Sequence, residues 1–103
     1  MGVHKAPTAE TLMRSRYSAF ATGAADYLLA TTHRSTRKQH DKAAILDWSQ
    51  TNQWIKLEVL HTTETTVTFQ AYYLDAHLKA QIHREKSRFI FENGQWFYVD
   101  GTY

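Results

Sequence analysis

The stretch QIHREKSRFIFENGQWFYVDGT, residues 81–102, contains two alternating segments joined at Asn93-Gly94. An Asn-Gly pair is the preferred centre of a two-residue hairpin turn, because both residues accept positive φ. Side chains alternate between the two faces of a strand, so the turn predicts the register of the whole hairpin. The expected pairs are Glu92 with Gln95, Phe91 with Trp96, Phe89 with Tyr98 and Ser87 with Asp100.

This register divides the side chains of the hairpin between two faces. One face is aromatic near the turn and polar at the far end, and it carries His83, Glu85, Ser87, Phe89, Phe91, Trp96, Tyr98 and Asp100. The other face mixes charged and apolar residues: Arg84, Lys86, Arg88, Ile90, Phe97 and Val99. We expect the first face to meet the helices. Its polar end would then line a semi-enclosed cavity that contains His83, Glu85, Ser87 and Asp100.

The rest of the chain predicts helices followed by further strands. Alternating apolar residues mark two more strands, at 54–61 and 66–74, so four consecutive strands form an antiparallel meander. Helical spacing predicts a first helix between Thr8 and Gly23, a second over 24–31 and a third over 42–50. Helices first and strands after predict an α+β domain, with three helices on one face of a four-stranded antiparallel sheet.

Length and composition limit the class of protein. With 103 residues and no cysteine, the chain is expected to form one domain, residues 1–103, without disulfides or thiolate metal sites. The net charge of +2 is too balanced to indicate a nucleic-acid partner. No apolar run approaches the roughly 20 residues of a membrane span, and MGVHKAPTAE lacks the apolar core of a secretory signal. We therefore expect a cytoplasmic protein with no membrane partner.

The segment LMRSRYSAF, residues 12–20, places two arginines in an apolar helical frame. Arg14 and Arg16 lie about 200° apart on a helix, so at least one must lie near the packed face. We predict that Arg16 points inward and that Arg14 lies nearer the rim. The expected ligand pocket or hydrogen-bond network consists of Arg14, Arg16, Tyr17, Ser87 and Tyr98.

Three segments of the chain resemble, in order, the central domain of the YchJ-like family of bacterial proteins: APTAETLMRSRYSAF, ADYLLATTHRSTR and REKSRF…NGQWFYVDG. The resemblance implies a cystatin-like fold of the nuclear transport factor 2 (NTF2) type, in which three helices lie on a strongly curved antiparallel sheet and form a cone. It also implies a cysteine-rich SEC-C motif, thought to bind zinc, on the N-terminal side. Because this sequence has no cysteine, we expect a trimmed piece or a short member without that zinc function. The resemblance implies a fold and no particular activity.

Three interpretations of the polar cavity remain open. First, Glu85 or Asp100, beside His83, could act as a general base, because two enclosed carboxylates raise the pKa of one of them. Cone-fold enzymes such as ketosteroid isomerase use such groups. Second, an arginine of the first helix could neutralise Glu85 or Asp100 while Ser87 fills the remaining hydrogen bond, as buried carboxylates usually require. Third, the cavity could bind a ligand without catalysis.

We predict a non-enzymatic module that binds a small ligand or a protein partner, with no cofactor. We predict no metal site, because no pair among five histidines has a spacing that defines one. These are His4, His33, His40, His77 and His83. The basic segment 33–42, expected to be a loop, could contact nucleic acid or a ribosome, but no aromatic residue interleaves it. A solvated connection is the favoured interpretation.

The outward face of the predicted sheet is more apolar than a solvated face should be. Ile90, Phe97 and Val99 lie on it beside Tyr72 or Leu74. Domains of this fold often pair sheet to sheet. We therefore predict a homodimer through this face.

Overall fold

The structure is a computed structural model that describes residues 6–103. His4 and the first half of MGVHKAPTAE lie outside the described residues. The elements are α1 (Ala9–Thr22), α2 (Ala25–Ala30), α3 (Arg34–Arg37), α4 (Lys42–Thr51), β1 (Gln53–Thr62), β2 (Thr66–Leu74), β3 (Ala80–Glu92) and β4 (Gln95–Thr102). The strands form one antiparallel sheet in the order β1-β2-β3-β4. The predicted α+β meander is confirmed.

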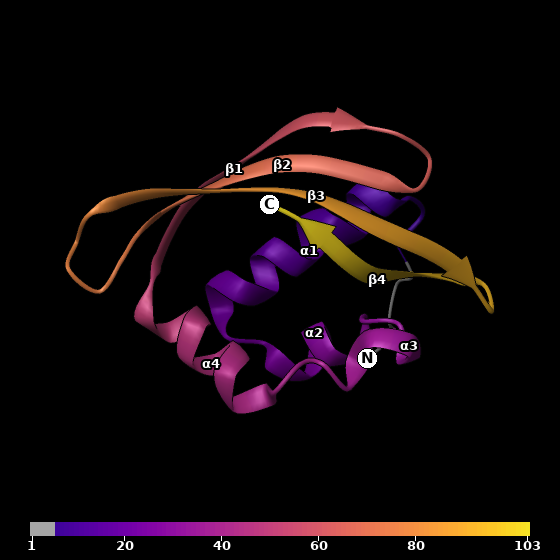
Figure 1. The fold of residues 1–103 in the computed structure, drawn as a ribbon, viewed down its shortest axis with the longest axis horizontal. Coiled ribbons are helices and arrows are strands. Elements are labelled where there is room, and N and C mark those ends of the chain that lie inside the picture. Colours follow the sequence, from indigo (N-terminus) through magenta and orange to yellow (C-terminus); the bar gives the residue numbers. More distant parts are fainter. Residues whose placement is uncertain (1–5) are drawn as a thin grey trace.

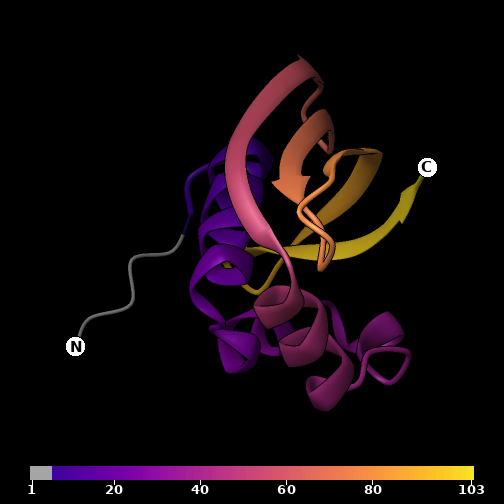
Figure 2. The same ribbon diagram turned by 90° about the vertical axis from the view of Figure 1, so that its left-hand side faces the viewer.

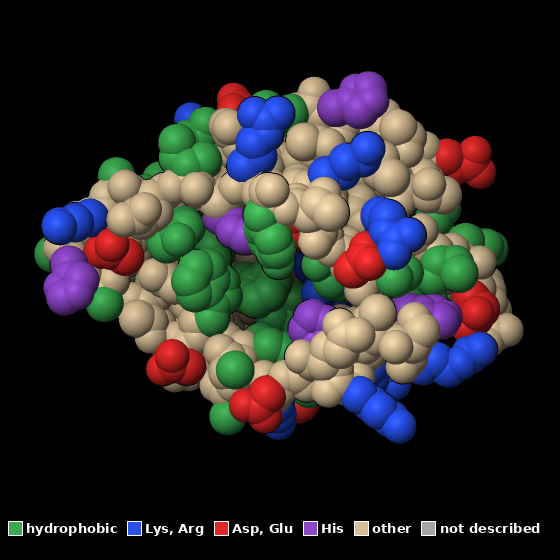
Figure 3. All heavy atoms as spheres, viewed as in Figure 1, with side chains coloured by type: hydrophobic (Ala, Val, Ile, Leu, Met, Phe, Trp, Pro, Cys, Tyr) green, Lys and Arg blue, Asp and Glu red, His purple; other side chains and the backbone are tan. Residues whose placement is uncertain are grey.

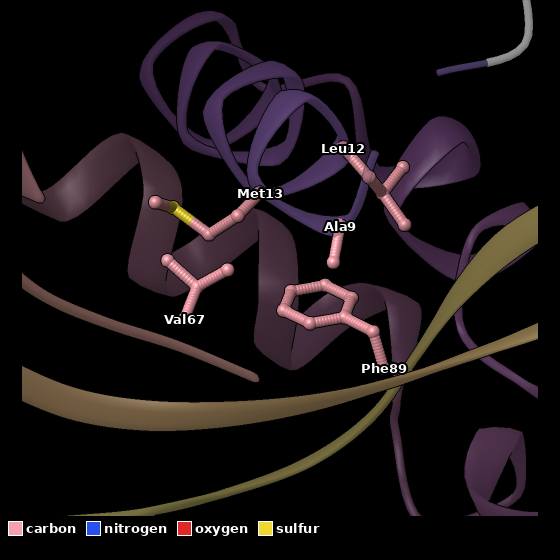
Figure 4. Packing of buried hydrophobic residues seen from close by; sticks show 5 residues of the cluster. All are labelled: Ala9, Leu12, Met13, Val67 and Phe89. Atoms are coloured by element: carbon pink, nitrogen blue, oxygen red, sulfur yellow. The ribbon is translucent and has the colours of Figure 1, made fainter. Parts of the chain in front are cut away.

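The helices lie on one side of a curved sheet (Figures 1 and 2). α1 follows the inner side of the sheet, and α2, α3 and α4 close the open side beneath it (Figure 1). A core of apolar side chains holds α1 against the sheet: Ala9, Leu12 and Met13 pack on Val67 of β2 and Phe89 of β3 (Figure 4). The core lies at one end of α1, so the remainder of the inner sheet face is left to line a cavity.

Local sequence signals place the helix ends. Thr8 caps α1 by accepting a hydrogen bond from the Thr11 N–H at 3.1 Å, and Gly23 ends it in the left-handed region at φ 75°. Asp41 caps α4 through the Ala44 N–H at 3.0 Å. The segment expected to be a loop instead contains α3, so the described residues form four helices. His33 caps α3 because its Nδ1 accepts from the Ser35 N–H at 3.1 Å, a cap that propensity alone does not indicate.

The last hairpin keeps its predicted register only from the turn to the Phe89–Tyr98 pair. Beyond that pair β4 contains a bulge, Arg88 pairs with Asp100, and Gly101 lies opposite Ser87. The single-residue shift moves Asp100 to the outer face, so the prediction that it lies in the cavity was wrong. Both of its carboxylate oxygens accept hydrogen bonds from Arg88, at 2.6 Å each. On the outer face the Asp100 carboxylate is paired with Arg88 and partly exposed to solvent. Inside the cavity it would have lain near a second negative charge, that of Glu85.

The far edge of β4 is hydrogen-bonded to another segment at the residue where the bulge begins. The chain leaving α2 runs beside β4 as an isolated parallel bridge between Thr32 and Tyr98. The Tyr98 N–H donates to the Thr31 carbonyl at 2.8 Å, and the His33 N–H donates to the Tyr98 carbonyl at 2.7 Å. These bonds fix Tyr98 from the side opposite β3. The hairpin register beyond Tyr98 is therefore not determined by the Asn-Gly turn alone.

The outer sheet face keeps exposed apolar residues, and the homodimer stays a prediction. Ile82 and Ile90 are exposed on β3, and Arg84, Lys86 and Arg88 alternate with the inward residues between them. Light scattering at high micromolar concentration tests the pairing: a dimer mass is expected, and a monomer would contradict it. In the described residues 6–103, no helix is both long and apolar enough to cross a bilayer.

Candidate ligand-binding site

The helices and the inner sheet face enclose a cavity of about 450 Å³. Figure 3 shows it as a hollow with hydrophobic side chains inside and histidines near its rim. Its volume lies in the range of small-molecule sites, roughly 300–1,000 Å³. Every helix except α3 and every strand contributes to its lining, which includes Tyr17, Phe20, Trp48, Trp54, Phe69, Phe89, Tyr98 and Tyr103.

An aromatic wall forms where α4 meets the start of the sheet. The ring of Trp48 lies edge-on to Trp54, with 5.7 Å between the ring centroids, and edge-on to Tyr73 at 5.4 Å. Trp54 also meets Tyr17 of α1 at 6.1 Å, and its indole N–H donates to the Ser49 carbonyl at 3.2 Å. These contacts fix the ring orientations and leave flat apolar surface on the cavity side.

The polar end of the cavity is centred on Glu85. This residue is 6% exposed, and its side chain accepts three hydrogen bonds: from Ser87 Oγ at 2.6 Å, Tyr98 OH at 3.0 Å and His83 Nε2 at 3.0 Å. Burial alone would raise the pKa of Glu85, but the donors from His83, Ser87 and Tyr98 outweigh burial and lower it. Glu85 is therefore a carboxylate at neutral pH, and the Nε2 of His83 carries the proton of their bond.

Gly101 makes room for this carboxylate. A Cβ built on Gly101 would lie 2.2 Å from Glu85 Oε2 and 2.4 Å from its Cδ. A glycine inside a strand often marks a close approach of this kind, which is the one signal in the sequence that could have revealed it. Sequence reasoning did not use that signal.

Tyr98 links Glu85 to Arg16. Burial and the negative charge of Glu85 raise the pKa of Tyr98, so its hydroxyl stays protonated and donates. The guanidinium carbon of Arg16 lies 4.4 Å from the centroid of the Tyr98 ring. The ring of His40 meets the same tyrosine at 6.4 Å, and burial together with Arg16 lowers the pKa of His40. His40 comes from the connection before α4 and was not predicted to belong to the site.

Arg16 points inward and is 8% exposed. It follows Leu12 and Met13 at four and three residues, so helical spacing places it on the same buried stripe of α1. Its Nη1 donates to the Leu28 carbonyl at 2.9 Å, to Thr31 Oγ1 at 2.7 Å and to Thr32 Oγ1 at 3.3 Å. Arg14 lies outside and pairs with Glu10 at 3.0 Å.

The structure therefore brings together six of the eight residues proposed from the sequence: Arg16, Tyr17, His83, Glu85, Ser87 and Tyr98 all line the cavity. Arg14 and Asp100 do not. The interpretation in which an arginine of α1 pairs with Glu85 or Asp100 was wrong in its cation, because His83 pairs with Glu85 and Arg88 with Asp100. Its other part holds, because Ser87 donates to Glu85. Arg88 lies opposite Asp100 because the bulge shifts the register by one residue; without the shift, Ser87 would lie opposite Asp100.

The basic segment 33–42 is held against the rest of the domain by ion pairs and hydrogen bonds. Arg34 binds Glu92 at 2.7 Å, and Arg37 donates through Nε and Nη2 to the Thr32 carbonyl at 3.1 and 2.9 Å. Lys42 pairs with Asp26 at 2.9 Å. Within residues 6–103, no group of three potential metal ligands from His, Cys, Asp or Glu lies close enough to hold an ion.

Helices packed inside a curved four-stranded antiparallel sheet, with a cavity between them, define an NTF2-like domain. Residues 8–101 match the family model described as "YchJ, middle NTF2-like domain", and the chain belongs to this family. The recognition made from the three sequence segments is confirmed.

Relatives and solved structures agree with this assignment. The chain is 46% identical over 101 residues to a UPF0225 protein of Polaromonas naphthalenivorans and 41% identical over 102 residues to one of Vibrio vulnificus, covering 93% of this chain in each case. It spans 70% and 60% of those two proteins. A SEC-C motif-containing protein from Rhodopseudomonas palustris, solved in solution, has a TM-score of 0.88 at 31% identity, covering 96% of this chain and 80% of that one. A crystal structure of a SEC-C motif-containing protein from Psychrobacter arcticus has a TM-score of 0.76 at 29% identity, covering 96% and 62%.

Proposed function

We propose that this domain binds a small, largely apolar organic molecule inside its cone, without changing it chemically. The observation that carries the proposal is the cavity itself, which combines an aromatic wall around Trp48 and Trp54 with a single polar end around Glu85 and Arg16. Apolar walls with a few convergent polar groups are typical of ligand sites, because the walls supply affinity and the polar groups fix orientation.

Binding is favoured over acid–base catalysis by the state of the carboxylates. A general base works best with a pKa near the working pH, and three hydrogen bonds lower the pKa of Glu85 instead. Asp100 lies outside the cavity on Arg88, so a second carboxylate does not raise the pKa of the first. The alternative of a cone-fold enzyme loses the pair of enclosed carboxylates on which it rested.

Closing the cavity mouth is expected to abolish binding without harming the fold. Ala44 lines the cavity but is exposed on α4, so Ala44→Trp places an indole across the opening without entering the core. Ala43→Trp is the matched control, because Ala43 is also exposed on α4 and does not line the cavity. The probe is naphthylacetamide, whose binding is measured by calorimetry and by backbone amide shifts in NMR.

We expect saturable binding to the unmodified protein and to Ala43→Trp, with amide shifts concentrated at β2, β3 and α4, and none to Ala44→Trp. Equal binding by both variants would place the probe elsewhere and contradict the proposal. The proposal would also be overturned if the unmodified protein bound none of three probes at millimolar concentration: naphthylacetamide, naphthylacetate and naphthylethylammonium.

A further inference from the structure

Arg16 is a buried charge without a counter-ion. Its three hydrogen bonds all leave from Nη1, and all end on neutral oxygens of Leu28, Thr31 and Thr32. Among the described residues, no carboxylate lies within ion-pair distance of its guanidinium. Buried charges are usually paired, because taking an ion out of water without a partner is costly. Burial lowers the pKa of Arg16 to about 10, against the opposing influence of Tyr98 and Glu85.

Two nitrogens of this guanidinium are left without a hydrogen bond. Nε and Nη2 of Arg16 make no hydrogen bond to any described residue, yet no side-chain nitrogen or oxygen of residues 6–103 is both fully buried and without a partner. These two nitrogens must therefore be accessible, and Arg16 lines the cavity. Nε and Nη2 form the planar fork that binds both oxygens of a carboxylate. Arg88 uses the same two nitrogens to hold Asp100, at 2.6 Å each.

The two carboxylates of the cavity, Glu85 and Asp41, do not offer an equivalent unused contact. The oxygens of Glu85 already accept from Ser87, Tyr98 and His83. Asp41 lies at the rim, is exposed, and caps α4. Arg16 therefore has no negatively charged acceptor among the described residues, and a ligand can supply one.

We propose that the ligand is an aromatic carboxylate, whose anionic group binds Nε and Nη2 of Arg16 while its ring lies against the aromatic wall around Trp48 and Trp54. This inference rests on the proposed function and names the chemical class of its ligand. Charge-assisted, bidentate hydrogen bonds are about twice as strong as neutral ones, and they fix the ligand's direction in the cavity. Glu85 lies beyond Tyr98 and keeps its own donors, so the two carboxylates need not share a contact.

Three probes of one size separate the possibilities: naphthylacetate, naphthylacetamide and naphthylethylammonium. We expect naphthylacetate to bind at least about tenfold more tightly than the amide, because a bidentate ion pair replaces a single hydrogen bond from Arg16 to a neutral amide oxygen. Arg16→Lys keeps the charge but loses the fork, and we expect it to remove most of the preference for naphthylacetate over naphthylacetamide.

A second readout does not depend on any variant. Arg16 and burial hold the pKa of His40 low, while Glu85 acts in the opposite direction. A carboxylate on Arg16 adds negative charge beside His40, so naphthylacetate is expected to raise the pKa of His40 in the unmodified protein. The neutral naphthylacetamide is not expected to change the pKa of His40. Titration of the His40 ring signals by NMR, with each probe saturating, measures the difference.

The outcomes distinguish this inference from the proposed function. If the amide or the ammonium binds as tightly as the carboxylate, or if naphthylacetate leaves the His40 titration unchanged, the carboxylate inference is overturned while a ligand cavity remains. If none of the three probes binds, both fall. Naphthylacetate binding that survives Ala44→Trp would be surface binding, and would also overturn the inference.

Discussion

Gly101→Ala is expected to lower the free energy of unfolding by about 2–4 kcal/mol, because the new methyl group would occupy the space of the Glu85 carboxylate. The Cβ position lies 2.2 Å from Glu85 Oε2, and Glu85 cannot withdraw without losing Ser87 and Tyr98. Urea unfolding followed by tryptophan fluorescence measures the change. Gly101 has no positive φ, so backbone strain does not contribute.

The control for this prediction is a double-mutant cycle. In a Glu85→Ala background the obstructing carboxylate is absent, so adding Gly101→Ala is expected to cost much less than it does in the unmodified protein. The two substitutions should therefore be strongly non-additive. A cost below about 0.5 kcal/mol for Gly101→Ala alone, or additivity of the two changes, would show that Glu85 does not need this space.

Glu85→Ala is expected to cost about 3 kcal/mol near neutral pH, because it leaves the buried hydroxyls of Ser87 and Tyr98 without their acceptor. The cost should depend on pH. The folded-state pKa of Glu85 is lowered, so its stabilising contribution is fully present above its pKa in the unfolded chain. That contribution is lost as the pH falls through the folded-state pKa.

The measurement is the difference in unfolding free energy between the unmodified protein and Glu85→Ala at pH values from neutral to acid. We expect the difference to narrow on acidification. Asp100→Asn serves as the surface control: Arg88 also lowers the pKa of Asp100, but this ion pair is exposed, and its loss should change stability far less. A pH-independent difference for Glu85→Ala would mean that the ionised carboxylate is not what Ser87 and Tyr98 stabilise.

Much of the architecture follows from short-range patterns. Asn93-Gly94 specified the turn and the first pairs of the last hairpin, and Thr8, Gly23 and Asp41 marked helix ends where the structure has them. These signals work from sequence because each acts within about four residues. Helical spacing also placed Arg16 on the stripe shared with Leu12 and Met13, which brought a charge to the inner side of the helix.

The contents of the cavity depended on contacts between distant segments. Tyr98 bonds to Thr31 and His33 across the edge of β4, and beyond it a bulge sends Asp100 outward and places Gly101 beside Glu85. A one-residue shift reverses the face of every following side chain, so an alternation pattern cannot predict where it occurs.

The sequence by itself determined the order of the elements, the hairpin turn and the inward face of α1, since local hydrogen bonds and periodic burial control all three. Only the tertiary structure decided that Arg16 keeps two donors free and that Glu85 receives its hydrogen bonds from His83, Ser87 and Tyr98. Those partners are chosen by the distance between side chains once α1, α2 and the sheet have packed, and no local pattern encodes that distance.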